Sequence, residues 1–117
     1  MSTIKADTLV AADGTSPTTL TSQYAAKVWT HFDADATIDG SFNSSSITDT
    51  DTGRFDVNFT NNMSDNSYAA SMLTQNNTDV GYNGISADHI GLYIRLLSSQ
   101  AAYDRDSNQL IVVGDLA

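Results

Sequence analysis

Residues 26–68 read AKVWTHFDADATIDGSFNSSSITDTDTGRFDVNFTNNMSDNSY, and this stretch decides the fold class. Aromatic and aliphatic residues stand at every second position, then Asp, Ser, Thr and Gly interrupt them, and then the alternation resumes. Successive side chains of a β-strand point to opposite faces, so this period is typical of strands with one buried face. The stretch therefore predicts antiparallel strands joined by polar turns.

The clearest hairpin signal lies where DTDTG (49–53) separates SFNSSSIT (41–48) from RFDVNFT (54–60). The second of these strands places Phe55, Val57 and Phe59 on one side and polar residues on the other. Asp and Gly are the residues that turns require, so the two segments are expected to pair.

Further strands are expected around Tyr24–Asp33, in NSYAASMLT (66–74), in HIGLYIRLLSS (89–99) and in QLIVVGDLA (109–117). The last is rich in β-branched residues and is expected in the middle of a sheet. The segment TQNNTDVGYNGISAD (74–88) reads as a long polar loop or a short hairpin, which could reach out from the body. About seven or eight strands at this spacing predict an all-β fold, a small antiparallel β-sandwich over residues 23–117.

Residues 1–22 are expected to form an extended N-terminal arm and its linker. STIKADTLV (2–10) is a short strand candidate. The segment that follows is rich in Thr and Ser and contains Asp13-Gly14 and the single Pro17, residues typical of turns and linkers. We predict that the arm serves attachment or assembly through Ile4, Leu9 and Val10.

The charge balance excludes some partners. All 14 acidic residues are Asp, only five residues are Lys or Arg, and the formal net charge is -9. Such a chain repels phosphate backbones and anionic membranes, so neither nucleic acid nor a membrane is an expected partner. Asp also favours turns over helix interiors, in agreement with an all-β chain.

No apolar run is long enough to span a bilayer, and the first residues lack the pattern of a signal peptide. We therefore expect synthesis in the cytoplasm and no membrane insertion. The absence of Cys excludes disulfides and thiolate zinc sites, so stability must come from packing or from other subunits.

Catalytic and metal-binding patterns are weak. His31 and His89 have no signature partners nearby, and no Ser lies in a G-x-S-x-G elbow. DADATIDG (33–40) and DTDTG (49–53) have oxygen ligands at alternate positions but lack the order and the final Glu of a calcium loop. We predict no enzyme activity, no catalytic residue, no cofactor and no metal, and read both segments as hairpin turns, with an irregular calcium site as the alternative.

Trp29 stands among polar residues on the second face of its strand. Three roles are open for it: a lid over the core, an anchor between subunits, or a platform on which a sugar ring stacks. We take Trp29, His31, Ile111 and Val113 as candidate subunit-interface residues.

Four segments, AKVWTHF, GSFNSSSITD, TGRFDVNFT and MSDNSYA, occur here in an order that resembles a module of tailed-bacteriophage virion proteins. That module is labelled tail fibre or fibre-like, chiefly in marine and cyanobacterial phages. The leader STIKADTLVAADG also resembles the leader of those proteins, and together the matches cover about 60 residues. Ser44, Arg54 and Ser64 depart from the usual apolar residue, acidic residue and Pro at their positions.

The resemblance implies a virion structural protein that assembles as a homotrimer, is anchored by its N-terminal arm and contacts other virion proteins. The first expectation is a small fibre-like protein projecting from the head or tail, which could contact a host surface glycan. One alternative is a capsid decoration protein that stabilises the shell. Another, of a different class, is a carbohydrate-binding module.

Overall fold

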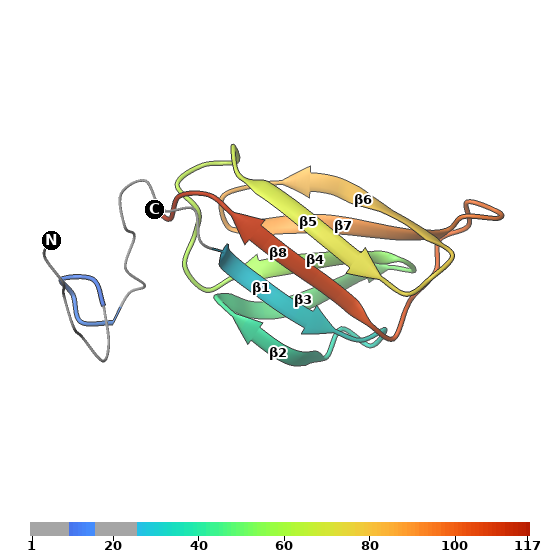
Figure 1. Cartoon of the computed structure of the whole chain (residues 1–117), viewed down its shortest axis with the longest axis horizontal. Coiled ribbons are helices and arrows are strands. Elements are labelled where there is room, and N and C mark those ends of the chain that lie inside the picture. The colour runs from blue at the N-terminus through green and yellow to red at the C-terminus, as the bar shows by residue number, and fades with distance from the viewer. Residues whose placement is uncertain (1–9, 16–25) are drawn as a thin grey trace, which may run out of the picture.

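The computed structural model of the chain describes residues 10–15 and 26–117 (Figure 1). In this part of the chain all regular structure is β, with eight strands. They are β1 (Ala26–Phe32), β2 (Ile38–Phe42), β3 (Ser44–Asp51), β4 (Arg54–Phe59), β5 (Ala69–Thr74), β6 (Thr78–Ile85), β7 (His89–Leu96) and β8 (Asn108–Val113). The predicted all-β fold class is confirmed, and the strand count agrees with the sequence.

The strands form two four-stranded antiparallel sheets, with the orders β2-β1-β8-β5 and β3-β4-β7-β6. We call them the front sheet and the rear sheet, because the first lies before the second in Figure 1. As expected for its β-branched sequence, β8 lies inside its sheet, between β1 and β5.

One core fills the space between the two sheets. It contains inward residues of the front sheet (Val28, Phe32, Leu110, Val112), inward residues of the rear sheet (Phe55, Val57, Phe59, Ile90, Leu92, Ile94) and Met63 from the β4–β5 connection. The rings of Phe32 and Phe55 meet edge to face across the two sheets, with centroids 5.3 Å apart. The period-two pattern therefore identified the buried face of each strand in which the sequence alternates throughout.

The segment SFNSSSIT is two strands and not one, which corrects the sequence expectation. Asn43 has φ 56°, a left-handed conformation that Asn tolerates better than most residues, and here the chain passes from β2 to β3. The Asn43 amide donates to the backbone oxygens of Lys27 and Asn61 and accepts from the Asn61 backbone N–H at 2.7 Å. These bonds fix the point where the chain changes sheets.

The polar segment 74–88 contains a strand and is not mainly a loop. Residues 78–85 form β6, which pairs with β7 and is the edge of the rear sheet. Its pairing shifts register at Asn83, a β-bulge. Partly buried Val80 and Ile85 pack against the core from β6, so tertiary contacts explain why a Gly- and Asn-rich segment is extended.

Tyr68 connects the two sheets at one end. It directly precedes β5 of the front sheet, and its hydroxyl lies 3.0 Å from the backbone oxygens of Ser86 and His89, which belong to the rear side. Its ring also packs edge to face on Phe59. Burial raises the pKa of Tyr68 to about 12, because the phenolate would lose its contact with water.

Candidate functional site

Large apolar side chains gather on the outer face of the front sheet. Each of its four strands contributes one, and their exposed fractions are 44% for Trp29, 43% for Phe42, 50% for Ile111 and 67% for Leu73. We call the outer surface of β2, β1, β8 and β5 the Trp29 face. Apolar residues scattered singly are ordinary on a protein surface, so their arrangement decides whether they form a site.

The strand register places these side chains next to one another. Trp29 is opposite Phe42 on one side and opposite Ile111 on the other. His31 is opposite Gln109, which is in turn opposite Leu73. Directly opposed residues on one face have Cβ atoms about 4.5–5.5 Å apart, so Phe42, Trp29 and Ile111 are direct neighbours. Leu73 lies diagonal to Ile111 on the same face.

The Trp29 indole lies over β2. A Cβ atom built on Gly40 would stand 3.4 Å from two carbons of the indole ring, so the ring rests on a strand position that has no side chain. Trp29 as a whole is 44% exposed. A rigid aromatic ring held in this way can contact a partner with little loss of conformational entropy.

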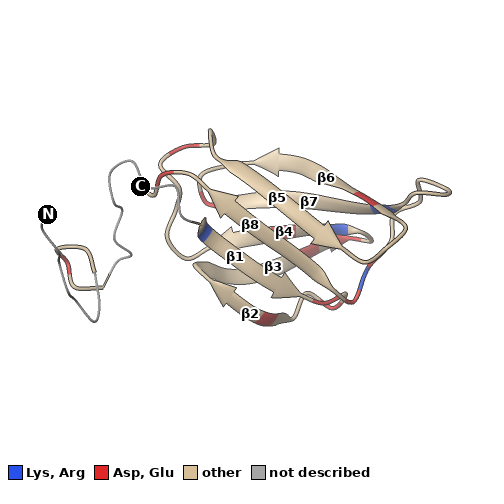
Figure 2. Cartoon of the chain, in the orientation of Figure 1, with Lys and Arg blue, Asp and Glu red and all other residues tan. Residues whose placement is uncertain are grey.

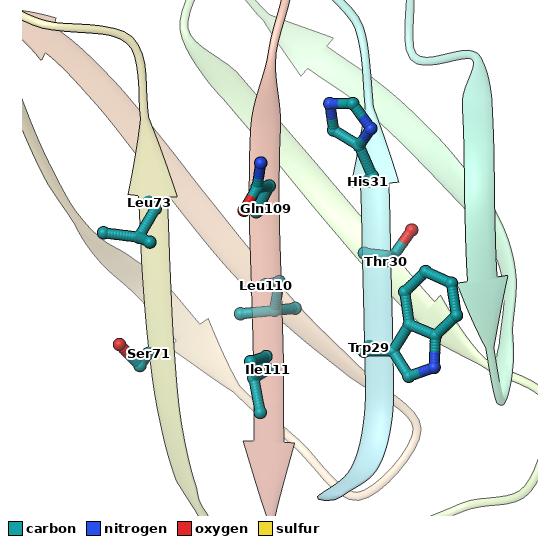
Figure 3. Close-up of a pocket in the computed structure, with 8 residues that line it drawn as sticks. All are labelled: Trp29, Thr30, His31, Ser71, Leu73, Gln109, Leu110 and Ile111. Atoms are coloured by element: carbon teal, nitrogen blue, oxygen red, sulfur yellow. The ribbon is translucent and has the colours of Figure 1, made fainter.

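The Trp29 face is hollowed beside the indole (Figure 3). The hollow has a volume of about 310 Å³; Trp29 and His31 line it from β1, Ser71 and Leu73 from β5, and Gln109 and Ile111 from β8. An apolar, concave surface of this kind can receive a protruding side chain of another protein.

His31 gives the hollow a polar margin. Its Nε2 atom lies 3.0 Å from the Ser107 hydroxyl, and its Nδ1 atom lies 3.7 Å from a carboxylate oxygen of Asp39. The ring is therefore oriented from two sides. A polar rim around an apolar centre is the usual composition of protein–protein interfaces.

Charge is almost absent from the front sheet. Its four strands contain two charged residues, Lys27 and Asp39, and Lys27 is 6% exposed (Figure 2). This is unusual in a chain with a net charge of -9. Contact between two Trp29 faces would bring few like charges together.

The structure brings three of the predicted interface residues together. Trp29, His31 and Ile111 share the hollow, and Val113 is half-buried two residues further along β8. Phe42 and Leu73 were not among the predicted residues. Alternation within residues 41–48 could have indicated Phe42, whereas Leu73 could be assigned to this face only once β5 was placed beside β8.

Of the three predicted arm residues, the structure describes Val10. Val10 is 49% exposed and precedes the turn at residues 12–13. Ile4 and Leu9 lie outside the described residues, so their proposed role in attachment stays a prediction.

A Ser, a His and an Asp meet at the β6–β7 turn, but their geometry is not that of a catalytic relay. The Nδ1 atom of His89 is 2.8 Å from the Ser86 hydroxyl and 2.9 Å from the Asp88 carboxylate. Both neighbours contact the same ring nitrogen, so the ring cannot pass a proton from one to the other through its two nitrogens. Hydrogen bonds from Ser86 and then from His89 hold the pKa of Asp88 below its usual value, and the cluster serves to fix the turn.

The two Asp-rich segments are hairpin turns in the structure. One Asp33 carboxylate oxygen accepts from the backbone N–H groups of Asp35 and Thr37, at 3.0 and 2.8 Å, an arrangement that stabilises a turn. Asp51 accepts in the same way from the N–H of Thr52. In residues 10–15 and 26–117, no group of three or more metal-binding side chains is present.

Within the described ranges, no helix is long and apolar enough to cross a membrane. No protein-family model, no curated protein and no solved structure matches the chain.

Proposed function

We propose that this chain is a bacteriophage virion structural protein, a small fibre-like homotrimer whose subunits associate through the Trp29 face. The observation that carries the proposal is the patch of Trp29, Phe42, Ile111 and Leu73, each between 43% and 67% exposed on a nearly uncharged sheet. The motif order in residues 26–68, which resembles the phage module, supplies the biological class.

The patch supports assembly because its residues are not required for the core. The inner faces of both sheets, together with Met63, already bury eleven hydrophobic residues. Aromatic residues are enriched at subunit interfaces, and Trp and Tyr supply a large share of binding energy there. Burying the patch against identical copies would remove an apolar surface from water at every subunit.

A capsid decoration protein is the second candidate within the same class. It would use the same face against capsid subunits instead of its own copies. A carbohydrate-binding module would use the exposed Trp29 ring as its platform, and the hollow beside the ring favours this third candidate. All three depend on the Trp29 face, so the mass of the wild-type chain and its binding to capsid shells or glycans separate them.

The decisive experiment measures the mass of the purified protein by sedimentation equilibrium at micromolar concentration. We expect a mass near three times 12.5 kDa, and a monomer for Ile111→Asp, because a carboxylate at the centre of the patch would be buried without a partner. Far-ultraviolet circular dichroism of the variant should show an unchanged β spectrum, as Ile111 is 50% exposed.

A wild-type chain that sediments as a monomer would contradict the trimer. Binding of that monomer to capsid shells would then favour decoration. Binding of a glycan that is lost in Trp29→Ala would favour the carbohydrate-binding module.

A further inference from the structure

The sandwich is open along the side where β5 and β6 lie. β5 is the edge strand of the front sheet, β6 is the edge strand of the rear sheet, and residues 75–77 join them. Between them is a hollow of about 540 Å³, larger than the hollow beside Trp29. Core residues Ile90, Leu92 and Leu110, each at most 2% exposed, line its floor. We call this opening into the core the side hollow.

Inward-facing side chains of both edge strands are exposed at the side hollow. Ala70 of β5 is opposite Val112, which is fully buried, yet Ala70 is exposed. Tyr82 of β6 is opposite Leu92, which is 2% exposed, yet Tyr82 is 64% exposed. Residues on the inner faces of a sandwich normally interdigitate to form its core. The two sheets are thus incompletely closed here, and one further apolar segment would complete the core.

β5 differs from the other three edge strands because it has no protection against pairing with another chain. Charges and interrupted pairing protect such edges. Asp39 lies on β2, Asp49 and Asp51 lie on β3, and Asp79 lies on β6, and the pairing of each of these strands shifts register. β5 reads AASMLT, without charge or Pro, and pairs with β8 without a shift. Its free edge is therefore suited to receive a strand.

The backbone of β5 indicates what kind of ligand fits. Among the described residues, the backbone groups of residues 69–74 hydrogen-bond to β8 alone. The N–H and C=O groups on the other side of β5 remain available, and an extended peptide can pair with them by adding a strand to the sheet. A small apolar molecule would fill the side hollow but leave these groups without partners.

The chain itself contains a segment with the required pattern, STIKADTLV (2–10). If this segment is extended, one of its faces carries Ile4, Ala6, Thr8 and Val10, and the other carries Lys5, Asp7 and Leu9. The single Lys and the single Asp cancel, so a chain with a net charge of -9 does not repel the segment. No charged residue lines the side hollow, which suits the apolar face.

We infer that residues 2–10 of a neighbouring copy bind as an additional strand along the free edge of β5. Ile4 and Ala6 enter the side hollow, and Leu9 lies on the outer side of the sheet, the side of Leu73. The inference deepens the proposed function and rests on its association of identical copies. It does not rest on the Trp29 face, since the contact uses an edge of the sheet.

Two observations favour a neighbouring copy over the same chain. Within the described part of the chain, residues 10–15 lie away from β5 and β6 (Figure 1), and Val10 is 49% exposed and does not line the side hollow. Residues 11–25 span at most about 50 Å, which is enough to reach a second subunit. An arm passed from each copy to the next is a heterologous contact, which closes into a ring in a cyclic trimer.

The first test uses disulfide cross-linking, because the chain contains no Cys. Full chains with Ile4→Cys, Ala6→Cys or Thr8→Cys, one at a time, are mixed with chains carrying Ala70→Cys and oxidised. Tandem mass spectrometry of proteolytic peptides then identifies the linked positions. We expect at least one link between an arm position and position 70, which a mixture of single variants can form only between copies.

A matched control uses Ala101→Cys in place of Ala70→Cys. Ala101 is exposed but does not line the side hollow, so we expect no link between it and the arm. A link from the arm to position 70 found only when both Cys are in one chain would place the arm on its own subunit and overturn the inference. A link only between two Ala70→Cys chains would overturn it as well, because two β5 edges would then pair directly.

The second test measures binding of the arm as a synthetic peptide of residues 2–10. The receptor is the full chain with Ile4→Asp, whose own arm would place a carboxylate in the side hollow. We expect amide NMR shifts in β5 and β6, and affinity at least about tenfold lower for a peptide with Ile4→Asp, because its carboxylate would be buried without a partner. Adding Ala70→Asp to the receptor should weaken binding similarly, whereas Ala101→Asp should not.

No binding of the peptide at millimolar concentration, or equal affinity for the two peptides, would overturn the inference. Adding Trp29→Asp to the receptor should leave peptide binding unchanged, because Trp29 does not line the side hollow. Failure of the Trp29 face as an interface is therefore distinguishable from failure of the arm contact.

Discussion

The outer faces of the two sheets differ, although the inner faces of both supply apolar side chains to the core. The front sheet exposes Trp29 and other large apolar side chains. The rear sheet exposes polar groups that bond to one another: the Asn58 amide, for example, donates to the hydroxyls of Ser46 and Thr48 at 3.1 and 2.9 Å. The same two-residue period therefore produces one surface suited to a protein partner and one suited to water or a polar ligand.

The distribution of charge repeats this difference. The strands of the front sheet contain Lys27 and Asp39, whereas those of the rear sheet contain Asp49, Asp51, Arg54, Asp56, Asp79 and Arg95 (Figure 2). Core packing does not require this difference in charge, because outward-facing side chains are not part of the core. We infer that the difference reflects what each face meets outside the subunit.

The largest expected effect comes from placing a charge on the front face. Trp29→Asp should weaken self-association by about 2–4 kcal/mol, the range of an interface hot spot, and sedimentation equilibrium measures the change. Leu97→Asp is the matched control, because Leu97 is 54% exposed and lies outside the four front strands. Equal effects of the two substitutions would remove the distinction between the faces.

The second effect concerns the turn that positions Arg54 on the rear face. Gly53 has φ 67°, and a Cβ atom there would lie 2.4 Å from the Ile94 backbone oxygen. Gly53→Ala should lower the free energy of unfolding by about 1–3 kcal/mol, the usual cost of backbone strain, as measured by urea denaturation.

Gly84→Ala is the control for Gly53→Ala. It lies on the same sheet, but a Cβ atom there meets nothing within 4 Å. A loss of stability as large as that of Gly53→Ala would mean that strand propensity, and not the close approach, decides the cost.

The third effect tests whether the two sheets are held together at Tyr68. Tyr68→Phe removes a hydroxyl that bonds across the sheets, and we expect a loss of about 1 kcal/mol in the free energy of unfolding near neutral pH. Thermal unfolding of both proteins at matched pH provides the measurement.

The same variant has a pH signature. The native pKa of Tyr68, about 12, lies above its ordinary value of 10.0. Its contribution is therefore complete below pH 10 and is lost as the pH rises from 10 to 12. Wild-type stability should fall through this window more steeply than that of Tyr68→Phe; parallel curves would assign the alkaline loss to other groups.

The smallest effect belongs to the ion pair on the rear face. The pair between Arg95 and Asp79 is more than one-third exposed on both sides, so Asp79→Asn should change the free energy of unfolding by less than about 1 kcal/mol. Chemical denaturation measures this change. A loss of several kcal/mol would mean that the pair supports the fold instead of orienting Tyr93.

Sequence reasoning predicted most of the fold but only part of the candidate site. Alternation within single strands identified Phe55, Val57 and Phe59 as core residues, and DTDTG as a turn, because both features are local. It left residues 74–88 open between a loop and a short hairpin, because the Gly and Asn residues of β6 have low strand propensity and pairing with β7 and packing on the core fix its conformation. The sequence also predicted a single strand across Asn43, because the change from one sheet to the other leaves no interruption in the polar pattern.

The sequence by itself determined that this chain is all-β, which side of each regular strand is buried, and that its charge is strongly negative, since these depend on residue type and a period of two. Only the tertiary structure decided which outward residues become neighbours. Trp29, Phe42, Leu73 and Ile111 come from four strands of the front sheet, and on the rear sheet the register places Arg54 opposite Tyr93. Strand order and register bring such residues together, and they arise from contacts between segments far apart in the chain.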